Sequence, residues 1–342
     1  MIENISSDQI KKNNDLSNLF VNAKYEDLNI NCNILKSNFY LDTYNYFPIN
    51  EKNNTFSSLF SRGKYYPNDH FYTDNFFKNF ENNLVNFKKL NNIFLLGSNP
   101  AGNYYSNMLQ FLPRLFFINE DNLKIGIHRN SSYKFRKLIT QINKKKGLNF
   151  SFTYLDDDFY RFNSSKIPQF LNLKKSNVIL KHFLQPRDIK KQDLKIYITR
   201  ENADYRKLIN EFDLVAMLKS EGYEIINPNL YEIKDQIKIF ARAKKIISPH
   251  GSGLTNIVFS QPGTEIIVIS PKFNNFYDLH YKNRYSLLSE YNKLQYKEII
   301  SDTVNVKKHS KTALTYINKN VLENSNNFKN LILKINDIKN LI

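Results

Sequence analysis

From Asn91 onward, short apolar runs alternate with longer segments of helical spacing, and this alternation constrains the fold more than any other feature of the chain. The short runs are rich in β-branched and aromatic residues, whereas the longer segments repeat apolar residues every three or four positions. Such alternation is typical of an α/β domain with a largely parallel sheet. The expected strands are 93–96, 123–127, 149–155, 177–180, 194–199, 223–226, 245–248 and 265–269.

The same pattern predicts how the chain is divided into domains. Residues 1–85 show no sustained period and are expected to be mixed structure, whereas the polar, proline-bearing segment 182–193 separates two series of strands and helices and is the predicted linker. Two such domains are expected to enclose a cleft, with ligands beyond the carboxyl ends of the strands. The expected helices are 104–117, 133–145, 207–220, 233–243 and 253–259. The predicted divisions are an N-terminal domain over 1–185, a second domain over 194–320 and an amphipathic closing helix over 321–342.

The charge balance leaves several kinds of partner open. Among the 342 residues, 49 Lys and Arg outnumber 32 Asp and Glu, which gives a net charge of +17. Such an excess suits nucleic acid, an anionic membrane face or a phosphorylated substrate, and it can equally be Lys-rich compositional drift. Cys32 is the sole cysteine, so no intramolecular disulfide is possible. With no signal-peptide pattern and no apolar run of about 20 residues, the chain is expected to be soluble and cytoplasmic, with only peripheral contact to a membrane.

The strongest local motif is the run K-I-I-S-P-H-G-S-G-L-T-N, which ends at Asn256. An expected strand ends at Pro249, a glycine-bearing turn follows, and a helix is expected from Gly253. The free N–H groups at a helix start favour an anion, and glycines allow a ligand to approach the backbone closely. His250 could donate a hydrogen bond to a phosphate oxygen. An ordinary strand-to-helix turn in which His250 merely caps the helix is the alternative.

A second motif places two arginines at the end of a neighbouring expected strand. The run I-Y-I-T-R-E-N-A-D-Y-R leads through Arg200 to Arg206. Because parallel strands end at the same edge of a sheet, these guanidinium groups are expected near the His250 turn, where their fork of donors suits a diphosphate. Surface pairing with Glu201, Asp204 or Glu211 is the alternative.

Taken together, these residues resemble glycosyltransferase family 61. The resemblance runs from Tyr197 to Ile269 through T-R-E-N-A-D-Y-R-K-L-I-N-E, F-A-R-A-K-K-I-I-S-P-H-G-S-G-L-T-N and Q-P-G-T. A weaker match, to the family's N-Y-Y-H-W and L-P-R-L segment, includes Tyr104, Tyr105 and Arg114, which are expected to be acceptor-side or structural residues. The resemblance implies a GT-B architecture of two facing Rossmann-like domains, with the donor on the second and the acceptor mainly on the first.

The resemblance also implies a reaction and a set of ligands. The reaction is an inverting, metal-independent transfer from a nucleotide sugar, favouring uridine diphosphate, to a saccharide or lipid-linked glycan acceptor in surface or capsular polysaccharide synthesis. No metal or other cofactor and no nucleic-acid partner are expected. Positive groups then stabilise the charge that develops on the departing nucleotide. The residues that the resemblance places around the donor diphosphate are Arg200, Arg206, His250, Gly251, Ser252, Gly253, Leu254 and Thr255.

The chain departs from the family pattern where an acid or base is often found. Ser106, Gln110 and Val268 stand where members often carry His, an acid and Glu. An inverting transfer needs a general base near the acceptor hydroxyl, so the base comes from elsewhere or the enzyme is impaired. The candidates, expected at strand ends of the first domain, are His128, Asp156, Asp157, Asp158 and His182.

Three other functions remain open at the level of sequence. The triplet at Asp156 to Asp158 satisfies the D-x-D pattern of metal-dependent transferases, because oxygen ligands suit hard divalent cations. The departures at Ser106 and Gln110 suit a non-catalytic member that binds nucleotide sugar or glycan. The net charge and many aromatic residues suit a nucleic-acid-binding protein, although the basic residues are dispersed and no recognition motif is present.

Overall fold

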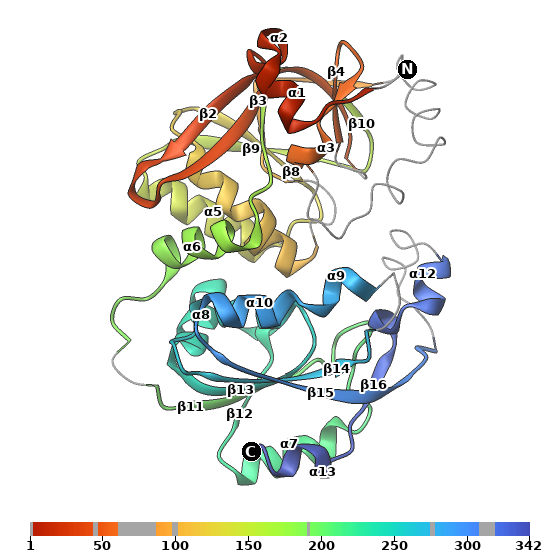
Figure 1. The fold of residues 1–342 in the computed structure, drawn as a ribbon. Coiled ribbons are helices and arrows are strands. Elements are labelled where there is room, and N and C mark those ends of the chain that lie inside the picture. The colour runs from red at the N-terminus through yellow and green to blue at the C-terminus, as the bar shows by residue number, and fades with distance from the viewer. Residues whose placement is uncertain are drawn as a thin grey trace. The chain divides into compact units, whose positions relative to one another are not determined.

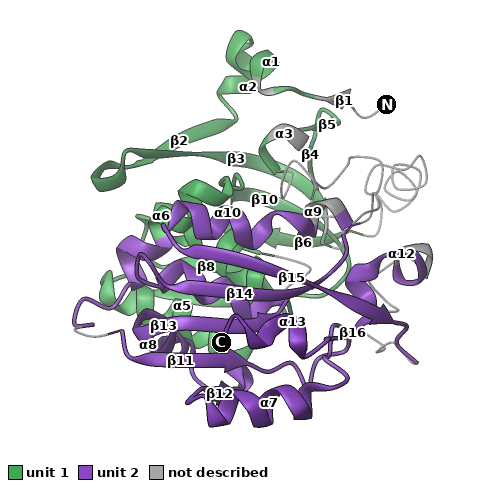
Figure 2. Cartoon of the chain, turned by 60° about the horizontal axis from the view of Figure 1, so that its bottom comes forward, with its two compact units in different colours: residues 1–179 green, residues 180–342 purple. Residues whose placement is uncertain are grey.

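The computed structural model separates into two compact units, Met1–Ile179 and Leu180–Ile342, and each has strands and helices interleaved (Figures 1 and 2). The α/β class is therefore confirmed. The predicted linker, 182–193, begins inside helix α6 (Leu173–Leu184). The structure describes residues 3–43, 47–60, 87–97, 102–189, 192–273, 278–307 and 319–342.

The sheet of the first unit is mixed rather than uniformly parallel. Its strand order is β1-β5-β4-β3-β10-β7-β8-β9, with β2 on β3 and β6 on β10. Strands β2, β3, β4 and β10 form antiparallel pairs, whereas β7, β8 and β9 are parallel neighbours. The strands are β1 (Glu3–Asn4), β2 (Phe20–Tyr25), β3 (Ile30–Asp42), β4 (Phe47–Asn50), β5 (Asn54–Thr55), β6 (Lys88–Asn91), β7 (Ile93–Leu95), β8 (Leu123–His128), β9 (Phe150–Leu155) and β10 (Phe159–Pro168).

This mixed sheet corrects the expectation of a Rossmann-like first domain. Strands β7, β8 and β9 are parallel neighbours, and β10 also pairs parallel with β6 and β7. The long strand β3, which the sequence pattern missed, carries the antiparallel part. Apolar and Asn residues alternate over 30–34, but the adjacent buried residues Ile34 and Leu35 shift the alternation and obscure its period of two. The helices of the first unit are α1 (Ser7–Lys12), α2 (Asn14–Ser17), η1 (Glu26–Leu28), α3 (Ser57–Phe60), η3 (Ser106–Phe111), η4 (Leu112–Phe117) and α5 (Tyr133–Lys145).

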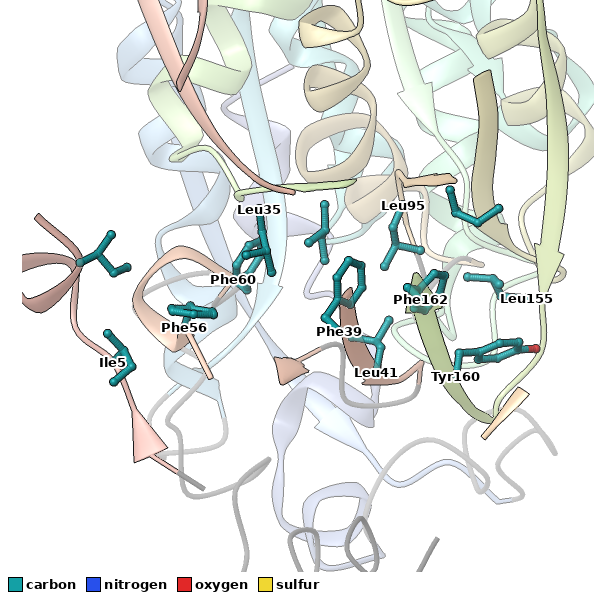
Figure 3. Packing of buried hydrophobic residues seen from close by; sticks show 13 residues of the cluster. Ile5, Leu35, Phe39, Leu41, Phe56, Phe60, Leu95, Leu155, Tyr160 and Phe162 are labelled. Carbon is teal, nitrogen blue, oxygen red and sulfur yellow. The ribbon is translucent and has the colours of Figure 1, made fainter. Parts of the chain in front are cut away.

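Aromatic and aliphatic side chains from both parts of this sheet form one buried cluster (Figure 3). Phe39 on β3 lies opposite Phe162 on β10, and their rings stack with centroids 5.0 Å apart. Leu95 from β7 and Leu155 from β9 belong to the same cluster. The antiparallel and parallel strands are therefore stabilised by a shared core.

Two predicted elements of the first unit differ in kind from those observed. The predicted strand 177–180 lies inside helix α6, where Ile179 and Leu180 are buried and Val178 is partly exposed. A short run of β-branched and apolar residues does not by itself distinguish a strand from a buried helix segment. The predicted helix 104–117 is a π-helical turn, η3, followed by a 3₁₀ helix, η4, that has Pro113 in its first turn.

The second unit contains the parallel sheet that the sequence predicts. Its order is β12-β11-β13-β14-β15-β16, in which all neighbours are parallel except the pair of β15 and β16. Helices α7 and α13 cover one face, and α8 and α10 cover the other (Figure 1). The strands are β11 (Leu194–Ile198), β12 (Glu224–Ile226), β13 (Ala243–Pro249), β14 (Glu265–Pro271), β15 (Gln295–Val304) and β16 (Asn330–Ile332). The helices are α7 (Glu211–Ser220), η5 (Pro228–Leu230), α8 (Ile233–Arg242), η6 (Ser252–Phe259), α9 (Leu279–Lys282), α10 (Arg284–Tyr291), α12 (Lys319–Asn324), η8 (Asn326–Phe328) and α13 (Asn336–Lys339).

The closing helix predicted over 321–342 is wrong. That stretch contains the end of α12, a 3₁₀ turn (η8), the strand β16 and the one-turn helix α13. The apolar residues do not share one helical face, because Leu331 enters the sheet core from a strand while Ile338 enters it from α13. Pairing of β16 with β15 gives its backbone the hydrogen bonds that a helix would otherwise supply.

Candidate functional site

The candidate site lies at the point where the strand order of the second unit reverses. After β11 the chain forms β12 on one side, then returns to form β13 on the other side of β11. In open α/β sheets, ligands bind beyond the carboxyl ends of the strands at such a point. Arg200 follows β11 and His250 follows β13, so the two predicted motifs lie at this reversal. We call Arg200, Arg206, His250 and the segment Gly251 to Thr255 the basic site.

Arg200 packs directly on the glycine that precedes helix η6. Its Nε donates to the Arg206 carbonyl at 3.3 Å, and its Nη2 donates to the Tyr205 carbonyl at 2.9 Å. A Cβ added to Gly251 would lie 2.0 Å from Arg200 Nη1. Because the backbone of Gly251 is extended, the glycine is required here for space alone. Arg200 Nη1 makes no hydrogen bond within the described part of the chain, which leaves it available to a ligand.

Glu211 fixes the backbone from which Arg200 extends. Its Oε1 accepts hydrogen bonds from the Tyr197 hydroxyl at 2.7 Å, the Thr199 hydroxyl at 3.0 Å and the Arg200 amide at 3.3 Å. This carboxylate therefore joins the end of β11 to the start of α7 and does not form an ion pair with the Arg200 side chain. The ion pair between the Arg200 side chain and Glu211, which the sequence left open, is not formed. Glu211 instead accepts a hydrogen bond from the Arg200 backbone.

Arg206 is buried and has a left-handed backbone with a φ of 56°. Its Nε donates to the His250 carbonyl at 2.6 Å, and its Nη1 donates to the carbonyl of Asn327 at 2.7 Å and to the Asn327 side-chain oxygen. A non-glycine residue in this region is costly unless its surroundings hold it there. Arg206 therefore connects the turn after β13 to Asn327, which lies 121 residues after Arg206 in the chain.

His250 is buried between two aromatic rings. Its ring centroid lies 5.0 Å from that of Phe273 and 4.8 Å from that of Tyr285. Neither ring nitrogen makes a hydrogen bond of good geometry within the described residues, although the backbone of Tyr281 favours the protonated ring. Burial, with the charges of Arg206, Arg284 and Arg200, lowers the pKa of His250 well below its usual value. The imidazole is consequently neutral at pH 7.

The basic site concentrates positive charge without a carboxylate to balance it. Burial, reinforced by the charge of Arg206, lowers the pKa of Arg200 to about 10, and burial also lowers the pKa of Arg206. Both guanidinium groups remain charged at neutral pH. Within the described ranges, neither forms an ion pair with Asp or Glu. Partly buried cations without counterions attract an anion strongly, because water screens them weakly.

The start of η6 adds backbone donors to these charges. Helix η6 begins at Ser252, and the Leu254 amide is the first to bond back, to the Gly251 carbonyl at 3.0 Å. Ser252 and Gly253 are partly exposed and precede the first amide that bonds back, whereas Leu254 and Thr255 are buried. The Tyr285 hydroxyl donates to the Gly251 carbonyl at 2.6 Å and fixes the turn. Amides at a helix start and two arginines together suit the oxygens of a diphosphate.

The acid–base candidates of the first unit are drawn into separate contacts. His128 Nε2 lies 3.0 Å from Asp157 Oδ1, and His128 Nδ1 accepts from the Asn130 amide at 3.1 Å. Asp156 pairs with Arg129 at 2.6 Å, which lowers the pKa of Asp156, and Asp158 pairs with Lys88 at 2.5 Å. Across the described residues, no three His, Cys, Asp or Glu side chains gather in a way that could hold a metal ion.

His182 differs from the other candidates in position. It lies in helix α6 and is exposed, with its ring against Phe183. It is therefore not at a strand end, which corrects the expectation for this residue. His128 does end strand β8, and the triplet beginning at Asp156 does follow strand β9.

Arg114 has a structural role in the first unit. It is fully buried, and its Nη1 donates to the Pro168 carbonyl at 3.1 Å while its Nη2 donates to the carbonyls of Leu95 and Leu96. Its guanidinium lies 4.4 Å from the centre of the Phe170 ring. These contacts connect η4 to the ends of β7 and β10.

The other first-unit residues of the weaker family match precede Arg114 by four to ten positions in the chain. Tyr105 and Ser106 are buried, and Tyr104 and Gln110 are partly exposed. Val268, the third departure from the family pattern, is buried inside β14 rather than at its end. Sequence reasoning missed Tyr285 and Asn327, since a lone Tyr in a helix and one Asn in an Asn-rich chain carry no local signal.

A doubly wound α/β unit with basic side chains at its strand reversal is typical of the class of proteins that bind phosphorylated ligands. Comparison with known families agrees with this class: residues 104–267 match the sequence model of the family Glycosyltransferase 61. The match supports a glycosyltransferase, and it confirms the predicted resemblance over that range. No curated protein matches the chain.

The matched range contains the basic site but not all of its surroundings. It includes Arg200, Arg206 and His250, and it ends within β14. Tyr285 and Asn327, which contact the basic site, lie beyond it. Separately, no helix in the described ranges is long and apolar enough to cross a membrane.

Proposed function

We propose that this chain transfers a sugar from a nucleotide-sugar donor, with a uridine diphosphate sugar as the favoured class, to a saccharide or lipid-linked glycan acceptor in surface or capsular polysaccharide synthesis. The observation that carries the proposal is the pair of arginines beside the start of η6, neither of which pairs with a carboxylate among the described residues. The family match supports the transferase class. The proposal places the donor on the second unit and the acceptor mainly on the first.

The proposed reaction inverts the sugar and uses no metal ion. The acceptor hydroxyl oxygen bonds to the anomeric carbon while the bond from that carbon to the diphosphate oxygen breaks. Negative charge develops on the departing diphosphate, and we assign its stabilisation to Arg200, Arg206 and the amides at the start of η6. These groups are fixed before the reaction, so they need little reorganisation as the charge develops.

The acceptor hydroxyl must lose a proton during this step, and the first unit supplies the candidates for the base. His128 and Asp157 form a hydrogen-bonded pair at the ends of adjacent parallel strands, which is a suitable place for proton transfer. The carboxylates of Asp156 and Asp158 are each engaged with a different cation. No observation in the structure favours the metal-dependent, non-catalytic or nucleic-acid-binding alternatives.

Arg200→Ala tests the donor site. Isothermal titration calorimetry with UDP is expected to show binding that is about tenfold to a hundredfold weaker than in the unaltered chain, because a charge-assisted hydrogen bond contributes about 1.5–3 kcal/mol. Gly251→Ala should weaken binding too, since its Cβ would displace Arg200 Nη1. Arg242→Ala is the matched control, because that exposed arginine of the same unit pairs with Asp193.

The result that would overturn the assignment is equally plain. If Arg200→Ala and Arg242→Ala bound UDP as tightly as the unaltered chain, the basic site would not be the donor site. If the unaltered chain bound neither UDP nor any member of a nucleotide-sugar panel, the proposed function itself would fail. Mass analysis of acceptor mixtures with the best donor then identifies the product.

A further inference from the structure

A late segment of the chain, residues 329–331, forms backbone hydrogen bonds with residues 206–209, the loop of the second unit that includes Arg206. The Arg206 amide donates to the Lys329 carbonyl at 2.9 Å, and the Leu331 amide donates to the Lys207 carbonyl at 2.8 Å. The Ile209 amide then donates to the Leu331 carbonyl at 2.9 Å. On its other side, β16 pairs antiparallel with β15. The loop that carries Arg206 is therefore connected to the sheet through this late segment.

Asn327 makes the most specific of these contacts. It is buried, and both its backbone carbonyl and its side-chain oxygen accept from Arg206 Nη1. Its own amide donates to Ser325 Oγ at 3.2 Å and to Asp278 Oδ1 at 3.4 Å. Asp278 also accepts from the Ser325 hydroxyl and from the Asn326 amide. The turn that presents Asn327 is thus held from several directions.

These contacts fix where the charge of Arg206 lies. Nε is used on the His250 carbonyl and Nη1 on Asn327, whereas Nη2 makes no hydrogen bond within the described part of the chain. Asn327 is neutral, so it orients the guanidinium without cancelling its charge. An aspartate at this position would accept the same hydrogen bonds but would neutralise the cation.

We propose that Asn327 is a positioning residue for the donor diphosphate. It holds Arg206 in its left-handed conformation and fixes the place of the Arg206 guanidinium within the basic site. This inference rests on the proposed function. Asn327 lies outside the range that matches the family, so the role belongs to a part of the chain for which only the structure provides evidence.

Two variants of Asn327 test this role in the full chain by calorimetry with UDP. Asn327→Ala removes the side-chain acceptor and is expected to weaken UDP binding about tenfold. Asn327→Asp keeps the acceptor and the fold, so its melting temperature should equal or exceed that of the unaltered chain, while its UDP binding should still be about tenfold weaker because a cation is neutralised. A purely structural role predicts that Asn327→Ala lowers the melting temperature but binds UDP normally.

Asn326→Ala is the matched control, because it removes one side-chain hydrogen bond of the same turn, to the Lys272 carbonyl at 2.9 Å, without touching Arg206. Its UDP affinity should be unchanged within about twofold. Normal UDP binding by Asn327→Asp, or an equal loss in Asn326→Ala, would overturn the positioning role. Failure of the unaltered chain to bind UDP would instead overturn the proposed function, and this inference with it.

Discussion

His250 shows how burial can turn an ordinary titrating group into a constraint on stability. Its ring lies between Phe273 and Tyr285, and nearby arginines add to the burial that lowers its pKa. The His250 imidazole therefore takes up a proton near pH 6.5 in the unfolded chain, but only at a lower pH in the folded chain. Where the unfolded state binds more protons, stability rises with pH. The contribution of His250 is thus fully present above pH 6.5 and is lost as the pH falls below it.

We expect the free energy of unfolding to fall by up to about 1.4 kcal/mol for each pH unit below about 6.5, and His250→Gln to reduce this slope. Urea unfolding at several pH values between about 5 and 8 measures it. His182→Gln serves as the control, because that histidine is exposed on α6. Equal slopes in the unaltered chain and in His250→Gln would show that His250 does not cause the effect.

Helix α7 has one buried side and one strongly exposed apolar residue. Leu214 and Leu218 are fully buried against the sheet of the second unit, with Tyr197 and Ile247 in the same cluster. Phe212 on the same helix is 85% exposed. The helix is therefore stabilised by a narrow apolar face, and its two faces should respond differently to truncation.

Leu218→Ala is expected to lower the free energy of unfolding by about 2–4 kcal/mol, because it removes apolar contacts and leaves a cavity. Phe212→Ala on the opposite side should change it by no more than about 0.5 kcal/mol. Denaturant titration of both variants measures the contrast. Similar losses in the two variants would mean that the faces of α7 are not packed as described.

The sequence pattern predicts elements well where the local signal and the tertiary environment agree. Helix α5 has the predicted bounds, 133–145, because its N-cap Ser132 and its apolar spacing give the same answer. The segment 177–180 is wrong because a short β-branched run fits both a strand and a buried helix face. The segment 321–342 is wrong because strand pairing with β15 decides its structure, and that partner is distant in sequence.

Part of the candidate site could be predicted from the sequence, and part depends on contacts between distant segments. Arg200 and His250 could be placed together from sequence because parallel strands end at one edge of a sheet. The contacts of Tyr285 with Gly251 and of Asn327 with Arg206 span 34 and 121 residues, and they depend on the completed fold rather than on a local pattern. The assignment of the basic site to a donor diphosphate stays a prediction.

At the scale of the whole molecule, each unit has its own core. One buried cluster joins β3, β7, β9 and β10 in the first unit, and another joins β11, β13, β14 and α7 in the second. Separate cores are expected to give separate cooperative transitions. A ligand that binds one unit then stabilises that unit by mass action.

Differential scanning calorimetry is therefore expected to resolve two transitions, of which UDP raises only one. Leu218→Ala should lower the same transition that UDP raises, whereas Leu95→Ala, in the core of the first unit, should lower the other. A UDP shift in the transition that Leu95→Ala lowers would place the ligand on the first unit and contradict the proposed donor site.

The net charge of +17 is distributed over residues in very different environments. Some of the basic residues form exposed ion pairs, as in the pairs of Arg129 with Asp156 and of Arg242 with Asp193, and such pairs contribute little to stability. Arg200 and Arg206 differ because they lie beside a helix start without a carboxylate partner in the described ranges. The position of these two charges is more informative than their total.

The separation of Arg206 from Asn327 also sets an order of events during synthesis. The two residues lie 121 positions apart, and ribosomes add about 5–20 residues each second, so Arg206 is made about 6–24 s before the asparagine that holds it. During that interval the left-handed turn lacks the hydrogen bonds that Asn327 and Lys329 supply. A nascent chain can therefore complete most of its second sheet before Asn327 orients Arg206, so we expect the proposed donor site to be completed late in the making of each molecule.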